Sequence, residues 1–288
     1  MYLNSITFPD TDAEFAVFID IKRTVYTSFY PFQILSKRQF DRIDFEPITV
    51  LYGGNGSGKT TALNVIAEKI EAERDSLYNK SSFFPEYLNY CSVEKNWEEP
   101  DFKRIITSND VFDFVLTLRS VNESVDEKRE ELFDDYLDTK YASFQLKSLD
   151  DYDRLKKMNE TRSKTQSKFV KSHLMNNVRE QSNGESAFRY FVEKIEENGL
   201  YILDEPENSL SPERQLELKQ YIEDSARFFN CQFIISTHSP FFLSIKGAKI
   251  YDLDADPVRI RQWTELENVR TYHKFFQEHA KEFRGGEE

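Results

Sequence analysis

A glycine-rich stretch at residues 53–60 constrains the fold more than any other part of the chain. It reads Gly-Gly-Asn-Gly-Ser-Gly-Lys-Thr and completes a G-x-x-x-x-G-K-T motif. The apolar run at residues 47–52 predicts a buried strand before the loop, and residues 61–70 predict a helix after it. In such a unit, successive backbone N–H groups and the helix N-terminus face one concavity, which favours bound phosphate. The pattern therefore predicts a nucleotide-binding strand–loop–helix unit.

The residue types of this loop have distinct expected roles. Lys59 is expected to reach the β- and γ-phosphates and to take part in catalysis, and the Thr60 hydroxyl is expected to ligate Mg²⁺. The nucleotide contacts predicted from this stretch are Gly53, Gly54, Asn55, Gly56, Ser57, Gly58, Lys59, Thr60 and Thr61.

The composition is typical of a soluble globular protein, with 288 residues, 39% hydrophobic and 31% charged. A formal net charge of −13 argues against coating nucleic acid by bulk electrostatics, although a local basic groove remains compatible with it. Cys91 and Cys231 match no disulfide or metal-ligand spacing, so a reduced, cytoplasmic location is expected. Neither a signal peptide nor a run of about 18 apolar residues is recognisable, so we expect no membrane association.

The N-terminal segment, residues 1–52, looks rich in strands. Residues 14–21 carry apolar side chains at alternate positions, which predicts a half-buried antiparallel strand. Tyr30-Pro31-Phe32 then interrupts the pattern. Tyr30 could stack on an adenine or pack into the core, and packing is the favoured interpretation.

Two apolar runs in the second half end in polar side chains. Residues 200–205 end in Asp204 and Glu205, and residues 231–238 end in His238. A helix between them is predicted to begin with Ser211 as N-cap. This strand–helix–strand order, with continuous apolar runs, predicts parallel strands buried on both faces.

The remaining elements are predicted more briefly. Further strands are expected at residues 103–108, 250–253 and 258–260. Asn109-Asp110 is expected to cap an apolar helix at 111–118, and Thr264 with Glu267 is expected to open a last helix that runs to about Phe283.

The polar strand ends suit phosphoryl transfer, in which a protein supplies mainly position and charge. Asp204 would hold Mg²⁺, together with Thr60. Glu205 would orient and deprotonate the attacking water, an effect of roughly 10²–10⁴ in rate. His238 would hydrogen-bond the γ-phosphate and sense its loss, since it ends a strand at the expected ligand-binding edge.

Residues 122–175 contain neither proline nor glycine and are divided by charge. An acidic first part runs to Asp153, and a basic second part runs from Arg154 to Lys171. A hairpin of two helical arms that attract each other is the simplest arrangement, with each arm roughly 30 Å long. A solvated helical face without a partner is an equal alternative. The basic arm is the only stretch suited to contact a phosphate backbone.

The order of these motifs resembles the ATP-binding-cassette ATPases. Within them the chain is similar to the RecF/SMC-type branch, and more narrowly to stand-alone bacterial ATPases labelled as AAA family. The resemblance covers nearly the whole chain except roughly 119–175. The segments that carry it are Tyr30-Pro31-Phe32, Gly53 to Thr60, Glu180 to Ser186, Tyr201 to Pro212, and Gln232 to Pro240.

The resemblance implies an α/β fold of the P-loop NTPase class and ABC-ATPase type. A mostly parallel core sheet would be flanked by helices, with an N-terminal antiparallel β part. Residues 1–288 would form one domain that carries a helical insertion at about 119–175. A homodimer would enclose two ATP molecules, with Ser182 and Gly184 of one subunit contacting the γ-phosphate held by the other. Residues 209–211 would cross the dimer interface.

The leading interpretation is a cytoplasmic, Mg²⁺-dependent ATP hydrolase whose dimerisation switches a partner. A protein partner is expected, and nucleic acid is less favoured; DNA maintenance and anti-phage defence are settings implied by the resemblance alone. The alternatives are an ATPase subunit of a membrane transporter and an ATP sensor without hydrolysis. The signature Ser-Asn-Gly-Glu-Ser at 182–186 and the lack of a clear Q-loop glutamine near Asn109 weigh against the transporter.

Overall fold

The computed structural model describes residues 1–20, 26, 28–141, 159–161, 163–173 and 183–284. The chain divides into two compact units. The first, here called the sheet unit, comprises Met1–Phe112 and Asn183–Glu288, and the second, the helical unit, is Asp113–Ser182.

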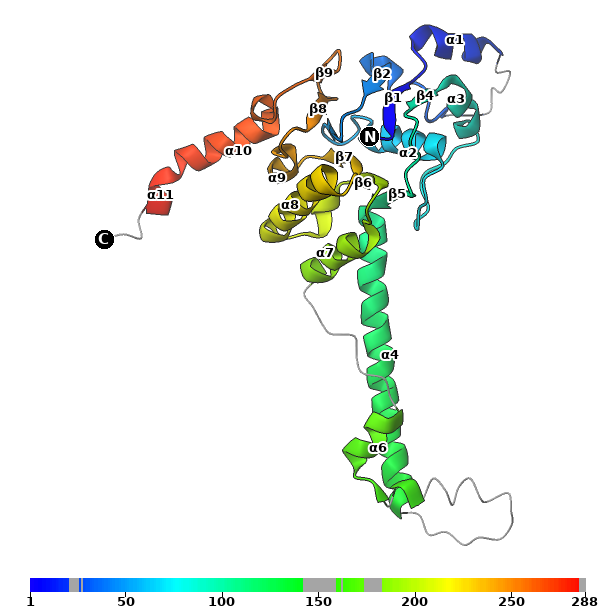
Figure 1. Cartoon of the computed structure of the whole chain (residues 1–288), viewed down its shortest axis with the longest axis vertical. Coiled ribbons are helices and arrows are strands. Elements are labelled where there is room, and N and C mark those ends of the chain that lie inside the picture. Colours follow the sequence, from blue (N-terminus) through cyan, green and yellow to red (C-terminus); the bar gives the residue numbers. More distant parts are fainter. Residues whose placement is uncertain (21–25, 27, 142–158, 162, 174–182, 285–288) are drawn as a thin grey trace. The chain divides into compact units, whose positions relative to one another are not determined.

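A six-stranded sheet forms the centre of the sheet unit, in the order β5-β6-β7-β3-β8-β9 (Figure 1). The first five strands in this order run parallel, and β9 pairs with β8 in the antiparallel sense. The parallel sheet predicted from the apolar runs is therefore confirmed. The strands are β3 (Ile48–Tyr52), β5 (Phe102–Thr107), β6 (Gly199–Asp204), β7 (Gln232–Thr237), β8 (Lys249–Asp252) and β9 (Arg259–Ile260).

A separate antiparallel sheet confirms the expected N-terminal β part. Its order is β2-β1-β4. The strands are β1 (Leu3–Thr7), β2 (Arg42–Asp44) and β4 (Ser92–Lys95).

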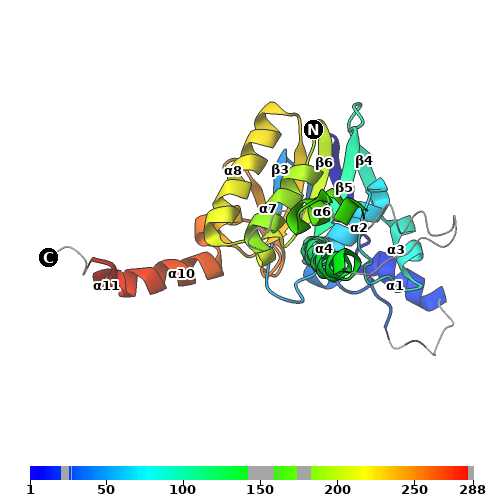
Figure 2. The ribbon, with the colours of Figure 1, turned by 90° about the horizontal axis from the view of Figure 1, so that it is seen from below.

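Helix α2 (Lys59–Ile70) joins the two sheets in one apolar core. Its buried side chains, Leu63 and Ile66 among them, belong to the same cluster as Ile6 of β1 and Ile202 of β6. Full burial of each large aliphatic side chain stabilises the fold by about 1.5–3 kcal/mol. This core fixes the end of β3 and the start of α2, and therefore the loop between them. Figure 2 shows α2 next to the strands, with α7 and α8 towards the opposite side of the view.

The strand predicted at residues 14–21 is wrong, because Thr11–Asp20 forms helix α1. Asp10 caps this helix by accepting a hydrogen bond from the Ala13 N–H at 2.8 Å. The buried positions are Glu14 and Val17, three residues apart on one helical face, whereas Phe15 and Ile19 are exposed. The apolar alternation in the sequence therefore did not mark the buried face. Ile21 lies outside the described residues.

The other helices of the sheet unit include α7 and α8 beside the large sheet and α10 and α11, which extend away from it (Figure 1). Ser211 caps α8 as predicted, since its side chain accepts from the Arg214 N–H. The last helix is interrupted at His279 and does not begin with the predicted Thr264–Glu267 capping box; the Gln262 N–H instead donates to Glu265 at the head of a 3₁₀ turn. The bounds are α3 (Phe84–Tyr90), α7 (Asn183–Lys194), η3 (Pro206–Ser209), α8 (Pro212–Phe228), α9 (Pro240–Leu243), η4 (Trp263–Glu265), α10 (Glu267–Glu278) and α11 (Ala280–Arg284).

Helix α4 (Ser108–Tyr141) begins at the end of the sheet unit and makes up most of the described helical unit. It joins the predicted helix at 111–118 and the first part of the predicted helical arm from residue 122 in one continuous helix. Its cap also differs, because the Thr107 N–H and hydroxyl both donate to Asp110, while Asn109 is exposed within the first turn.

Within the helical unit, α6 (Gln166–His173) packs against α4 through apolar side chains. Tyr136, Phe169 and Val170 form this buried cluster, and the Tyr136 hydroxyl donates to the Lys164 carbonyl at 3.0 Å. The predictions for residues 142–158 and Arg162, which include most of the basic arm, concern residues outside those that the structure describes. Among the helices that the structure describes, we find none with the length and apolarity needed to cross a membrane.

Candidate active site

The glycine-rich loop connects β3 to α2 at the carboxyl edge of the large sheet. Gly58 precedes the helix with φ of 99°, a left-handed conformation that glycine adopts without strain. Gly54, Asn55 and Gly56 are exposed, while Ser57 and Lys59 are buried. The first part of the loop is therefore exposed to solvent, and the side chains of Ser57 and Lys59 are buried in the protein.

Two observations indicate that this loop fits a bound phosphate chain. A Cβ atom added at Gly53 would lie 2.5 Å from the Ser57 hydroxyl oxygen, so the close turn requires glycine there. The Ser57 hydroxyl is buried without a hydrogen-bond partner among the described residues, and the exposed amides beside it precede a helix N-terminus. The residues present therefore fit an anionic ligand at this loop.

Lys59 folds back over the loop. Its Nζ donates to the Gly53 carbonyl at 2.6 Å and to the Gly54 carbonyl at 3.1 Å. It also lies 3.5 Å from Glu205 Oε1, and only 4% of its side chain is exposed. The predicted cation and the predicted base are thus brought together.

Asp204, the last residue of β6, lies next to Thr60. The Thr60 hydroxyl donates to Asp204 Oδ1 at 3.4 Å, and the Ser236 hydroxyl donates to the same oxygen. Burial raises the pKa of Asp204 above its ordinary value, and the nearby Glu205 charge adds to this. A partly buried carboxylate beside a hydroxyl is suited to Mg²⁺, which binds few protein oxygens and completes its coordination with water and phosphate.

Glu205 occupies an unusual backbone position. Its φ is 49°, in the left-handed region, and its N–H donates to the Ser236 carbonyl at 3.0 Å. Its Oε2 accepts from the Asn208 side chain at 3.0 Å, while Oε1 faces Lys59. This turn aims the carboxylate towards the phosphate loop.

His238 follows β7 on the other side of Glu205. Its Nδ1 lies 4.0 Å from Glu205 Oε1 and 3.5 Å from Glu207 Oε1. Half of the His238 side chain is exposed, so the imidazole remains accessible at this edge. The predicted residues Lys59, Glu205 and His238 therefore form one cluster.

The strand order explains how the sequence brings these groups together. β7 lies between β3 and β6, and Ser236 is in register with both Leu51 and Asp204. Three strand ends, two of them distant in sequence from the phosphate loop, thus meet at one edge.

The sequence interpretation overlooked several residues of this cluster. Asp254 accepts a hydrogen bond from the Gly54 N–H at 2.8 Å, and Ser236 and Asn208 contact Asp204 and Glu205. Asn268, at the start of α10, donates to the His238 carbonyl at 2.6 Å. Of these residues, only Ser236 could have been predicted from the sequence, because it lies two residues before His238 at the end of a predicted strand.

The second predicted nucleotide contact lies at the start of α7. The ideal Cβ position of Gly184 is 3.6 Å from the Ser211 N and 3.8 Å from the Ser209 carbonyl oxygen. The signature glycine and the 209–211 loop are therefore neighbours on the sheet unit. Ser182 lies outside the described residues.

Tyr30 is partly buried against the core, with its ring centroid 6.1 Å from that of Phe84. This contact agrees with the favoured packing role.

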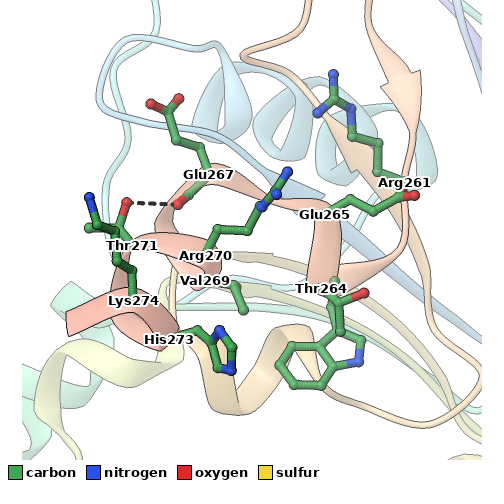
Figure 3. Close-up of a pocket in the computed structure, with 10 residues that line it drawn as sticks. Arg261, Thr264, Glu265, Glu267, Val269, Arg270, Thr271, His273 and Lys274 are labelled. Atoms are coloured by element: carbon green, nitrogen blue, oxygen red, sulfur yellow. Dashed lines mark hydrogen bonds between the residues drawn. The ribbon is translucent and has the colours of Figure 1, made fainter. Parts of the chain in front are cut away.

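Two hollows flank the first turns of α10. One, of about 730 Å³, is lined by residues between Arg261 and Lys274; Figure 3 shows Arg270 and His273 beside it, with Thr271 donating to the Glu267 carbonyl at 2.9 Å. The other, of about 510 Å³, is lined by His238 and Glu207 together with aromatic side chains of α10. A hollow therefore lies between His238 and the first turns of α10.

The fold and the site define a P-loop ATPase: an α/β core with a phosphate loop, a partly buried strand-end aspartate and an adjacent glutamate. The family model described as ABC transporter matches residues 42–208, more than half of the chain. The chain therefore belongs to the family of ATP-binding-cassette ATPases. A second model, described as AAA ATPase domain, matches residues 182–243.

Solved structures similar to this chain share little sequence with it. The SMC head domain from Thermotoga maritima is 14% identical, with a TM-score of 0.40, and the match covers 91% of this chain and 99% of that one. A Pyrococcus furiosus Smc head domain bound to the C-terminal domain of ScpA is 12% identical, with a TM-score of 0.39, covering 82% and 94%. An inward-facing putative metal-chelate type ABC transporter is 18% identical, with a TM-score of 0.36, covering 79% and 78%. A search of curated proteins found no significant match.

Proposed function

We propose that this protein is a Mg²⁺-dependent ATP hydrolase that dimerises around two ATP molecules and thereby switches a partner protein in the cytoplasm. The observation that carries this proposal is the cluster of Lys59, Glu205 and His238 beside Asp204 and Thr60. These are the charges that phosphoryl transfer to water requires, at one edge of a rigid sheet.

The contacts support a role for each group. The Gly53–Thr60 loop and Lys59 would bind the phosphate chain, and Asp204 with Thr60 would hold the cation. Mg²⁺ bound there would supply positive charge to the phosphate oxygens. Glu205 orients the attacking water and accepts its proton, because its carboxylate is fixed by Asn208 and by its own backbone. His238 hydrogen-bonds the γ-phosphate, which couples the nucleotide state to α10 through Asn268.

Dimerisation is supported by the adjacency of Gly184 to the 209–211 loop. In the proposed dimer these residues complete the nucleotide site of the second copy. Free, buried Cys91 and Cys231 suit a reducing compartment.

The test measures both ATP turnover and the molar mass of the protein in solution. Wild-type protein is assayed for phosphate release from Mg·ATP, and its molar mass is measured by light scattering with and without Mg·ATP. We expect hydrolysis and a nucleotide-dependent dimer. A dimer without turnover would identify the non-hydrolysing sensor instead, and turnover that appears only with a membrane-embedded partner would identify the transporter subunit.

A further inference from the structure

Glu207 is a buried carboxylate that none of the roles above uses. It lies in η3, directly after the left-handed turn at Glu205, and only 7% of the residue is exposed. Its Oε2 has no hydrogen-bond partner among the residues that the structure describes. An ionisable group buried this deeply costs free energy unless its charge is well used, so its placement needs a reason.

The other carboxylate oxygen, Oε1, holds the end of β7. It accepts hydrogen bonds from the Thr237 hydroxyl at 2.7 Å, the His238 N–H at 2.9 Å and the Ser239 N–H at 3.2 Å. The same oxygen lies 3.5 Å from Nδ1 of the His238 ring. One atom thus fixes the backbone that carries the histidine and also faces its imidazole.

The backbone of His238 is held from the other side as well. Its carbonyl accepts from the Asn268 side chain at 2.6 Å. The main chain of His238 is thus fixed at both its N–H and its carbonyl. The ring can still differ in its orientation and in which of its nitrogens carries the proton. Glu205 Oε1, at 4.0 Å, and Glu207 Oε1 both lie near Nδ1, and the Glu205 carboxylate also faces Lys59.

We propose that Glu207 is the positioning residue of His238, an inference that rests on the proposed hydrolytic function. A carboxylate beside Nδ1 favours the form of imidazole that carries its proton on that nitrogen. Nε2 is then the nitrogen that serves the γ-phosphate or its water. Glu207 therefore acts on turnover through His238 and not by touching the nucleotide, as carboxylates behind metal-ligating histidines act through the ring.

A double-mutant cycle separates this role from that of a simple structural brace. The variants are Glu207→Gln, His238→Ala and the two combined, each assayed for kcat and KM with Mg·ATP. We expect Glu207→Gln to lower kcat about 10-fold, with KM within about twofold of wild type. In the His238→Ala background the same substitution should change kcat by less than about twofold, because its route of action is already gone.

Glu223→Gln is the matched control. Glu223 is also a poorly exposed carboxylate, with 12% of its side chain exposed, and it accepts from the Lys246 N–H at 3.0 Å, away from the nucleotide site. We expect its kcat to equal that of wild type. Equal losses from Glu207→Gln in both backgrounds, or an unchanged kcat in the single variant, would overturn the proposal.

A second measurement does not depend on turnover. Nitrogen-15 spectra of histidine-labelled protein, with His238 assigned by its loss in His238→Ala, report which ring nitrogen carries the proton. We expect protonated Nδ1 in the wild type and a shift towards the other tautomer in Glu207→Gln. An Nε2–H tautomer in the wild type would overturn the inference even if Glu207→Gln did not fold. Absence of hydrolysis by the wild type, with protonated Nδ1, would reject the proposed function and leave the positioning of the ring supported.

Discussion

The carboxyl edge of the large sheet and the helical unit use charged residues in opposite ways. At the sheet edge, Lys59 and Glu207 are almost fully buried and each contacts several specific groups. In the helical unit, ion pairs such as Lys128–Glu131 and Lys164–Glu160 join residues three or four positions apart in the sequence. Exposed local pairs of this kind contribute little to stability. The charged groups at the sheet edge therefore have several specific partners each, whereas the exposed charges of the helical unit pair mainly with near neighbours in sequence.

The largest effect is expected at the most buried cation of the site. Lys59→Ala should abolish ATP binding, since the loop amides alone do not replace the lost charge at the phosphates. In the wild type, Mg·ATP at ~100-fold over its dissociation constant should stabilise the fold by about 2.7 kcal/mol. A thermal-shift assay measures this stabilisation. An equal shift in Lys59→Ala would show that the buried Lys59 is not needed for ATP binding.

Glu205→Gln should separate binding from chemistry. The amide keeps the shape of the side chain but cannot accept a proton, so turnover should fall by roughly 10²–10⁴. The Mg·ATP thermal shift should remain, because the phosphate loop is intact. Retained turnover would reassign the base to another residue of the cluster.

Gly184→Asp tests the surface beside the 209–211 loop. A carboxylate there would face the γ-phosphate of the second copy with like charge, so dimer formation and turnover should be lost together. ATP binding to the single chain should persist. Light scattering with Mg·ATP gives the mass, and a variant that still dimerises and hydrolyses would contradict the proposed arrangement.

The smallest effect is expected in the helical unit. Lys168 and Lys171 are exposed on α6, so reversing both to Glu should change the free energy of unfolding by less than about 0.5 kcal/mol each and leave turnover intact. DNA binding should be negligible in both proteins. Tight binding that weakens with a log–log salt slope near −0.9 per phosphate contact, and that the variant loses, would make this unit a nucleic-acid surface and break the comparison.

The sequence predicted which groups lie together at the sheet edge, because motif chemistry and strand ends coincide. The phosphate loop, Asp204, Glu205 and His238 each follow or precede a continuous apolar run, and parallel strands must bring such ends to one edge. It did not predict Asp254 or Asn268, since these side chains reach the site from segments whose local pattern carries no sign of it.

The fold was predicted less evenly. The strand expected at 14–21 is helix α1, because the Asp10 cap and a helical face with Glu14 and Val17 outweigh the alternation of apolar residues. At helix α4 the predicted helix at 111–118 and the predicted helical arm from residue 122 are one continuous helix, because helix-forming residues and local ion pairs continue across the charged part. The apolar pattern alone did not show that the two segments join.

The central position of β7 has a consequence for how this protein opens. Its residues are paired on both sides, to β3 and to β6, and all six are buried. Such a strand exchanges its amide hydrogens only when the sheet comes apart as a whole. A nucleotide that binds the folded state but not the unfolded state shifts the global unfolding equilibrium. It should therefore slow amide exchange along Gln232–Thr237 by the same factor. Amide exchange in β7 therefore measures nucleotide binding through the stability of the whole sheet unit.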